Sequence, residues 1–171
     1  PNTYIQTQNM ISKLTKKDYQ MRLGVLVLAS LSPIICLLYE YRPSLSSYWN
    51  TGMQPLFIIA NVLTSYYLYQ IKNWRPSSLM LLLLTAFSIN LYPALHNGLA
   101  ILFFIVTLYP LRMTNHYKWV GWIYLFSMVI LPFNMLGAEI IAIWSLCLHQ
   151  GLMLRKLNKL NQNKDERNSN I

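Results

Sequence analysis

The fold is decided by the stretch "PSSLMLLLLTAFSINLYPALHNGLAILFFIVTLYPL", residues 76–111, which contains no charged residue. A membrane-spanning helix needs about 20 apolar residues, because a rise of ~1.5 Å per residue must cross a hydrocarbon core ~30 Å thick. The stretch is too long for one span and suits two short ones. Turn residues gather only in "YPALHNG", so we expect helices over 77–92 and 97–111 with the break at this motif.

The other hydrophobic runs repeat this pattern. Residues 119–154 carry Glu139 as their only charge and contain the turn motif "PFNMLG", so they should also form two helices. The further spans are expected at 23–39, 55–71, 119–131 and 136–154. The sequence therefore predicts an all-α fold, a polytopic transmembrane helix bundle of six spans arranged as three hairpins.

Composition and charge agree with this class. The chain is 54% hydrophobic and only 11% charged, whereas a soluble domain has roughly 25% charged residues. If both termini lie inside, all 14 basic residues except Arg42 fall on the inner side, as the positive-inside rule requires. We therefore expect an integral, multi-pass protein with cytoplasmic termini, in a bacterial inner membrane or an equivalent membrane.

The domain organisation follows from the same pattern. We expect a basic cytoplasmic segment at 1–22, the six-helix transmembrane domain at 23–154 and a basic cytoplasmic tail at 155–171. The N-terminal segment could be a helix on the membrane surface or a disordered tail. The expected partners are membrane lipids, with anionic headgroups at the cytoplasmic face, and other membrane proteins or further copies of the chain. Nucleic acid is not expected, since the basic residues punctuate hydrophobic runs.

Polar residues on the outer side suggest one candidate site. Glu139 lies at the start of the last span, where ionisable groups are rare and usually have partners. Arg42 is the only basic residue outside and His96 the only histidine there, so either could pair with Glu139 and clasp the hairpins. The alternatives are a ligand or catalytic site and simple exposure to solvent. We take His96, Asn97, Glu139 and Arg42 as the candidate ligand-binding set.

A second polar feature lies within the second span. Asn61, Thr64 and Ser65 follow each other at i, i+3 and i+4, so they form a stripe on one face of the helix. Such side chains commonly form hydrogen bonds between helices. The alternative is a stripe that faces the central cavity of an oligomer.

Catalytic motifs are not evident. The three histidines lie in different segments and should not converge on a metal. No nucleophile elbow and no phosphate-binding glycine loop is present. The two cysteines have no C-x-x-C partner and are expected to be buried thiols. We therefore expect no catalytic residue, no metal and no cofactor, and we favour a non-enzyme over an enzyme.

One short motif suggests a family. In "LHNGLAILFF", His96, Gly98, Ala100, Phe103 and Phe104 follow an H-x-G-x-A-x-x-F-F spacing, and Glu139 lies in "LGAEIIAIW". With the six-span topology, the chain resembles the DRAM/FRAG-type membrane family and related bacterial six-span proteins of unknown function. This resemblance implies a link to lipid handling or membrane trafficking, mostly without a known reaction. The first outer loop is shorter than in eukaryotic members.

Three functional hypotheses follow. The first is a membrane protein without catalysis that interacts with lipid or a small ligand, or is an accessory subunit of a larger membrane complex. The second is an oligomeric pore or small transporter, which needs the Asn61, Thr64 and Ser65 stripe to face a central cavity. The third is a lipid-modifying enzyme, which needs His96 and Glu139 within hydrogen-bond reach.

Overall fold

The structure, a computed structural model, describes residues 15–113 and 117–169, and within these ranges it contains helices and no strands. The α-helices are α2 (Lys16–Tyr39), α3 (Gln54–Tyr69), α4 (Arg75–Ala86), α5 (Pro93–Met113), α6 (Lys118–Ile130) and α7 (Met135–Ser169). Two 3-10 helices lie in the connections: η1 (Leu45–Asn50) and η2 (Lys72–Trp74). The all-α class predicted from the sequence is confirmed.

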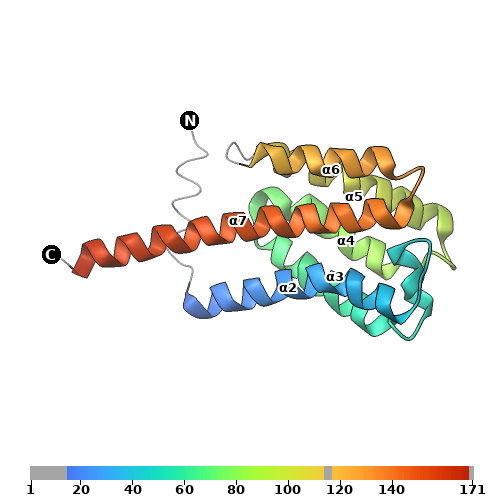
Figure 1. Cartoon of the computed structure of the whole chain (residues 1–171), viewed down its shortest axis with the longest axis horizontal. Helices are drawn as coiled ribbons and strands as arrows, with labels where there is room; N and C mark the ends of the chain where they lie inside the picture. The colour runs from blue at the N-terminus through green and yellow to red at the C-terminus, as the bar shows by residue number, and fades with distance from the viewer. Residues whose placement is uncertain (1–14, 114–116, 170–171) are drawn as a thin grey trace.

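The helices form a ring. Each α-helix packs against the next one in the chain, and α7 also packs against α2. Figure 1 shows the helices running back and forth along the long axis of the molecule. The η1 segment, the α4–α5 turn and the α6–α7 turn lie at one end, and the start of α2 and the end of α7 lie toward the other. Neighbours in sequence are therefore neighbours in space.

Three helices can cross a bilayer. The helix α2, the helix α5 and the part of α7 from Met135 to Asn163 are each long and apolar enough by length and composition. The other α-helices are shorter, and the 12 residues of α4 rise only about 18 Å. The fold is thus consistent with an integral membrane protein.

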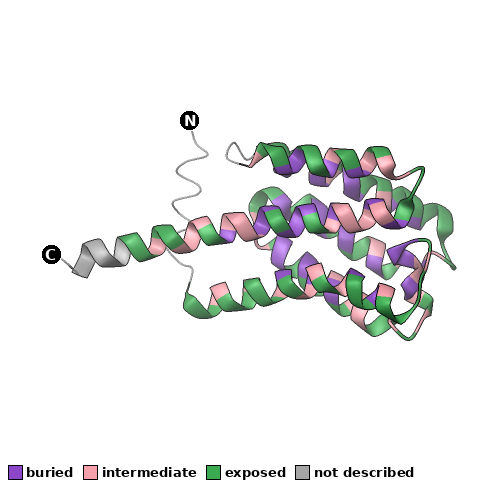
Figure 2. Cartoon of the chain, viewed as in Figure 1, coloured by how far each residue is buried: buried purple, intermediate pink, exposed green. Residues whose placement is uncertain are grey.

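The outward-facing side chains support contact with lipid. Large apolar side chains are exposed on every α-helix, among them Leu38, Ile101, Val129 and Trp122. Figure 2 shows exposed positions running along the helices beside stripes of buried ones. A soluble monomer rarely exposes contiguous apolar patches above a few hundred Å², because water disfavours them. A surface of this kind suits hydrocarbon.

The break inside the charge-free stretch falls earlier than predicted. The helix expected over 77–92 ends at Ala86, and Phe87 has an extended backbone. The hydroxyl of Ser88 accepts a hydrogen bond from the backbone N–H of Asn90 and helps form the turn. Pro93 then begins α5 instead of ending the preceding helix. The physical reason is that proline suits the first turn of a helix, where its missing N–H costs nothing.

The first and the last α-helix, α2 and α7, extend beyond their expected spans. The helix α2 begins at Lys16, where Thr15 and Asp18 form a capping box, and it continues without a break past residue 22. The helix α7 continues through residue 155 to Ser169. The basic N-terminal segment expected at 1–22 is thus part of α2 from Lys16 onward. Residues 1–14 lie outside the described residues.

Candidate functional site

Glu139 connects the start of α7 to the η1 segment. Its Oε2 atom accepts a hydrogen bond from the backbone N–H of Leu45 at 2.6 Å. Its Oε1 atom accepts a longer one from the hydroxyl of Ser46 at 3.4 Å. Because Leu45 and Ser46 belong to η1, the carboxylate ties this connection to the last helix.

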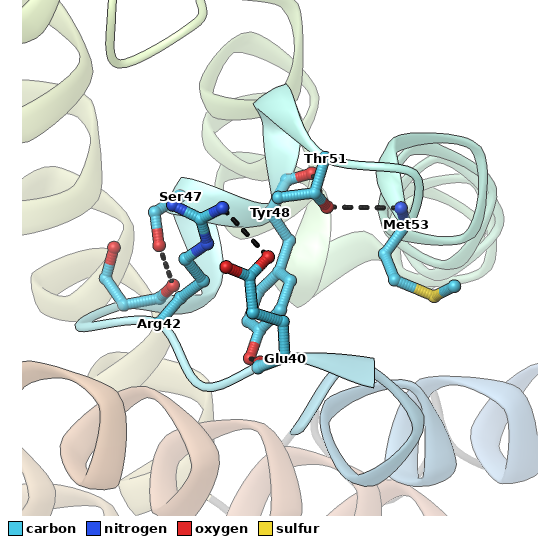
Figure 3. Close-up of polar contacts among 7 residues, drawn as sticks. Glu40, Arg42, Ser47, Tyr48, Thr51 and Met53 are labelled. Carbon is cyan, nitrogen blue, oxygen red and sulfur yellow. Dashed lines mark hydrogen bonds and ion pairs between the residues drawn. The ribbon is translucent and has the colours of Figure 1, made fainter. Parts of the chain in front are cut away.

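The η1 segment is held in place by its own polar contacts, shown in Figure 3. The hydroxyl of Tyr48, a fully buried side chain, donates to the carbonyl of Glu40. The hydroxyl of Ser47 donates to the carbonyl of Ser44 at 2.5 Å, and Thr51 Oγ1 accepts the N–H of Met53 at 3.1 Å. Burial is the main cause that raises the pKa of Tyr48, so its hydroxyl stays protonated and remains a donor.

A cavity of about 80 Å³ lies beside Glu139, between η1 and the helices α2, α3, α4, α5 and α7. Its walls are mostly apolar, and its polar groups are few. The polar lining residues are Ser32, Ser46, Asn61, Thr64 and Glu139. The apolar part includes Ala29, Phe57, Leu81, Ala100, Phe103, Phe104, Ile143 and Leu146. Apolar walls with a few polar groups that converge are typical of small-ligand sites.

Arg42 does not pair with Glu139. Its Nη2 atom forms an ion pair with Glu40 at 2.8 Å, and both side chains are partly exposed to solvent (Figure 3). The clasp between Arg42 and Glu139 that the sequence suggested is therefore not formed. Arg42 lies two residues after Glu40, and Glu139 obtains its partners from the backbone N–H and hydroxyl groups of η1 instead.

His96 closes the α4–α5 hairpin and is not among the residues that line the cavity. It is buried near the start of α5, and its Nδ1 atom lies 2.6 Å from the carbonyl oxygen of Phe87, the C-cap residue of α4. Since a carbonyl can only accept, Nδ1 carries the proton. The neighbouring Asn97 is exposed. The suggested pair of His96 with Glu139 is thus replaced by a contact to the end of α4.

The polar stripe on α3 divides between two surroundings. Asn61 and Thr64 line the cavity, and the hydroxyl of Thr64 also donates to the carbonyl of Ala60 at 2.7 Å. Ser65 instead faces α4, where Ser65 and Ser78 each donate to the other's carbonyl oxygen at 2.7 Å. Part of the stripe therefore connects two helices, and part faces a cavity inside the chain.

The cavity contains groups that the sequence did not reveal. The backbone N–H of Leu45 leaves no trace in residue type, and Ser32 sits among apolar residues of α2. Ser46 could have been noticed, because it belongs to the serine-rich stretch "PSLSSY" near the expected outer face. Within the described ranges, no three His, Cys, Asp or Glu side chains lie close enough together to hold a metal ion.

The chain matches no family model, no curated protein and no solved structure. The resemblance to the DRAM/FRAG-type family therefore stays a prediction. Of its motif residues, Ala100, Phe103 and Phe104 line the same cavity as Glu139. The function must be inferred from this geometry.

Proposed function

We propose that the chain is a six-span membrane protein, built of three hairpins, that binds a small ligand or the headgroup of a lipid at Glu139 without catalysing a reaction. The observation that carries this proposal is the cavity between the helices, with one carboxylate at its η1 end. A half-buried carboxylate in mostly apolar surroundings costs free energy, so its presence needs a reason beyond packing.

The lining of the cavity suggests which ligands would bind. It contains no lysine, arginine or histidine. Two groups of η1 donate to Glu139, and the remaining lone pairs of its carboxylate can accept further hydrogen bonds. A ligand with an ammonium group, or with several hydrogen-bond donors, complements this site, whereas a phosphate would be repelled.

The size of the cavity limits the part of the ligand that enters it. One water molecule needs roughly 10–15 Å³ of such volume, so about 80 Å³ holds a few waters or a small polar group. Phosphatidylethanolamine is of the right kind, with its ammonium at Glu139 and its phosphate and acyl chains outside the cavity. A bulky ligand would require the helices to separate.

Arginines at the end of the bundle opposite η1 support the proposed orientation. Their guanidinium groups stack on aromatic rings, at 5.7 Å for Arg22 on Tyr67, 5.3 Å for Arg75 on Tyr69 and 4.6 Å for Arg112 on Trp122. Arginine and aromatic rings both favour the headgroup level, and basic residues favour the cytoplasmic side. The short helices α3, α4 and α6 would cross with local thinning of the bilayer.

The other hypotheses have less support from the geometry. A pore formed by oligomerisation needs the α3 stripe on the outside of the chain, but Ser65 is paired with Ser78 and Thr64 lines an internal cavity. An enzyme using His96 and Glu139 needs both side chains at one cavity, but His96 is bonded to Phe87. We therefore propose neither.

The test compares two glutamates. The full chain is purified in mild detergent, and phosphatidylethanolamine and phosphatidylcholine are titrated while bound lipid is counted by native mass spectrometry. We expect the unmodified chain to prefer phosphatidylethanolamine, because the trimethylated headgroup of phosphatidylcholine cannot donate hydrogen bonds. Glu139→Gln should remove this preference. The control Glu40→Gln, which removes the exposed carboxylate paired with Arg42, should retain it.

Two results would overturn the proposal. One is equal binding of the two lipids by the unmodified chain. The other is a preference that survives Glu139→Gln or disappears equally in Glu40→Gln.

A further inference from the structure

A second hollow lies outside the ring, between α2 and α7. It is a groove of about 370 Å³, considerably larger than the cavity at Glu139. Its walls are formed mainly by Leu23, Val27, Leu148 and Leu152, and Arg155 lies at its border. Gly151 also lines it. The hydrocarbon walls and the cation together distinguish this groove from an ordinary gap between lipid-facing helices.

The register of the two helices locates the charged end of the groove. The indole Nε1 of Trp144 donates to the carbonyl of Ser30 at 3.0 Å, which fixes α7 against α2. Because the helices are antiparallel and rise equally per residue, Arg155 lies level with the first turns of α2. One further turn along α7, Lys159 lies about level with Lys16.

Among the residues that the structure describes, Arg155 has no ion-pair or hydrogen-bond partner. Its side chain is exposed. Lys16 and Lys159 are exposed as well. In Figure 1 the start of α2 and the later part of α7 lie toward the same end of the molecule. Along the helix axes, Lys16 and Lys159 therefore lie about one turn beyond the Arg155 end of the groove.

We propose that this groove binds an anionic phospholipid, with an acyl chain along its apolar wall and the phosphate at Arg155, near Lys16 and Lys159. A hydrocarbon chain alone would leave the cations unused, and a free phosphate would not need the apolar wall. Arginine suits a phosphate because its planar guanidinium forms paired hydrogen bonds. The lipid belongs to the leaflet on the side where α2 begins, and its charge is opposite to that favoured at Glu139.

Two glycines provide a matched pair of variants. A Cβ atom added at Gly151 or at Gly24 would meet no atom within 4 Å, so both positions accept a side chain. Both glycines lie inside long helices, but only Gly151 lines the groove. Gly151→Leu, on α7, should therefore fill the groove. Gly24→Leu adds the same side chain on α2 but outside the groove.

The experiment titrates phosphatidylglycerol and phosphatidylcholine into the full chain in mild detergent and counts bound lipid by native mass spectrometry. The unmodified chain should bind phosphatidylglycerol at least tenfold more tightly than phosphatidylcholine. Arg155→Gln should reduce this difference to less than threefold, and Gly151→Leu should weaken binding of both lipids. Gly24→Leu and Glu40→Gln should bind phosphatidylglycerol as the unmodified chain does. Glycerol phosphate at millimolar concentration should not compete.

Each opposite result would overturn the proposal. These results are equal binding of the two lipids, no effect of Arg155→Gln, an equal effect of Gly24→Leu and Gly151→Leu, or displacement by glycerol phosphate. If Gly151→Leu does not fold, Arg155→Gln decides alone, with Arg155→Lys expected to restore only part of the preference, because lysine keeps the charge but cannot form the paired hydrogen bonds. The cavity at Glu139 is tested separately, by the preference of Glu139→Gln for phosphatidylethanolamine. The failure of the groove proposal is therefore distinguishable from the failure of the cavity proposal.

Discussion

Glu139 near the start of α7 accepts the backbone N–H of Leu45 in η1 at 2.6 Å, across 94 positions of the chain. This hydrogen bond closes the η1 end of the helix ring, and it holds the carboxylate at the cavity.

Replacing Glu139 should destabilise the fold more than replacing Glu40. Glu139→Ala leaves the buried N–H of Leu45 without an acceptor, which costs about 1–3 kcal/mol. Glu40→Ala removes only a solvent-exposed ion pair, worth about 0–1 kcal/mol. Thermal unfolding of the two variants in the same detergent measures the difference. Equal melting temperatures would contradict the role of Glu139 as a connection between η1 and α7.

Tyr48→Phe should loosen the η1 segment while leaving its packing intact. The change removes the hydroxyl that donates to the carbonyl of Glu40 and costs about 0.5–1.5 kcal/mol, since the ring itself remains buried. Amide hydrogen exchange across η1 should become faster. The matched control is Tyr41→Phe, at a side chain that is 75% exposed, and it should leave exchange unchanged. Unaltered protection in Tyr48→Phe would refute the prediction.

Ser65 and Ser78 should show a measurable coupling. The two hydroxyl oxygens lie 3.1 Å apart, so the side chains contact each other directly, besides each donating to the other residue's backbone carbonyl. Hydrogen bonds between membrane helices contribute on average about 0.6 kcal/mol in double-mutant cycles. The cycle of Ser65→Ala, Ser78→Ala and the double variant, measured by unfolding in detergent, should give a coupling of this size. Strictly additive effects would show that the two hydroxyls do not interact with each other.

The proposed orientation predicts which positions a membrane-impermeant maleimide reaches in intact cells. Tyr41 lies before η1 and Asn73 lies in η2, and both are exposed. Tyr41→Cys should be labelled in intact cells, and Asn73→Cys only after lysis. Cys36 and Cys147 are buried and should contribute little background. Labelling of both variants, or of Asn73→Cys alone, in intact cells would contradict three hairpins with both termini inside.

Much of the helical architecture could be predicted from residue types. Apolar runs and turn residues located the helices, and Asn134 and Gly137 of the "PFNMLG" motif do form a helix start, where Asn134 Oδ1 accepts the N–H of Gly137 at 2.9 Å. The helix boundaries were less predictable. A proline ends one helix or begins the next according to which backbone groups are already paired, and the helix expected over 97–111 begins at Pro93.

The candidate site was less predictable than the fold. Glu139 and His96 were recognised as unusual, but their partners are backbone groups of Leu45 and Phe87. Every residue has a backbone carbonyl and every residue except proline a backbone N–H, so residue types do not predict which backbone group a side chain will contact. Arg42, one of the two partners suggested for Glu139, pairs with Glu40 instead, because complementary charge alone does not reveal which of two acids lies closer.

The sequence by itself determined that the chain is helical and that α2, α5 and α7 can cross a membrane, because length and apolarity act locally along each segment. Only the tertiary structure decided that α7 returns to α2, that η1 donates to Glu139 and that a cavity remains between them. These features depend on how closely distant helices pack and on the direction in which each side chain points. Residue types alone fix neither the packing distance nor the side-chain direction, because both depend on contacts between helices that are distant in sequence.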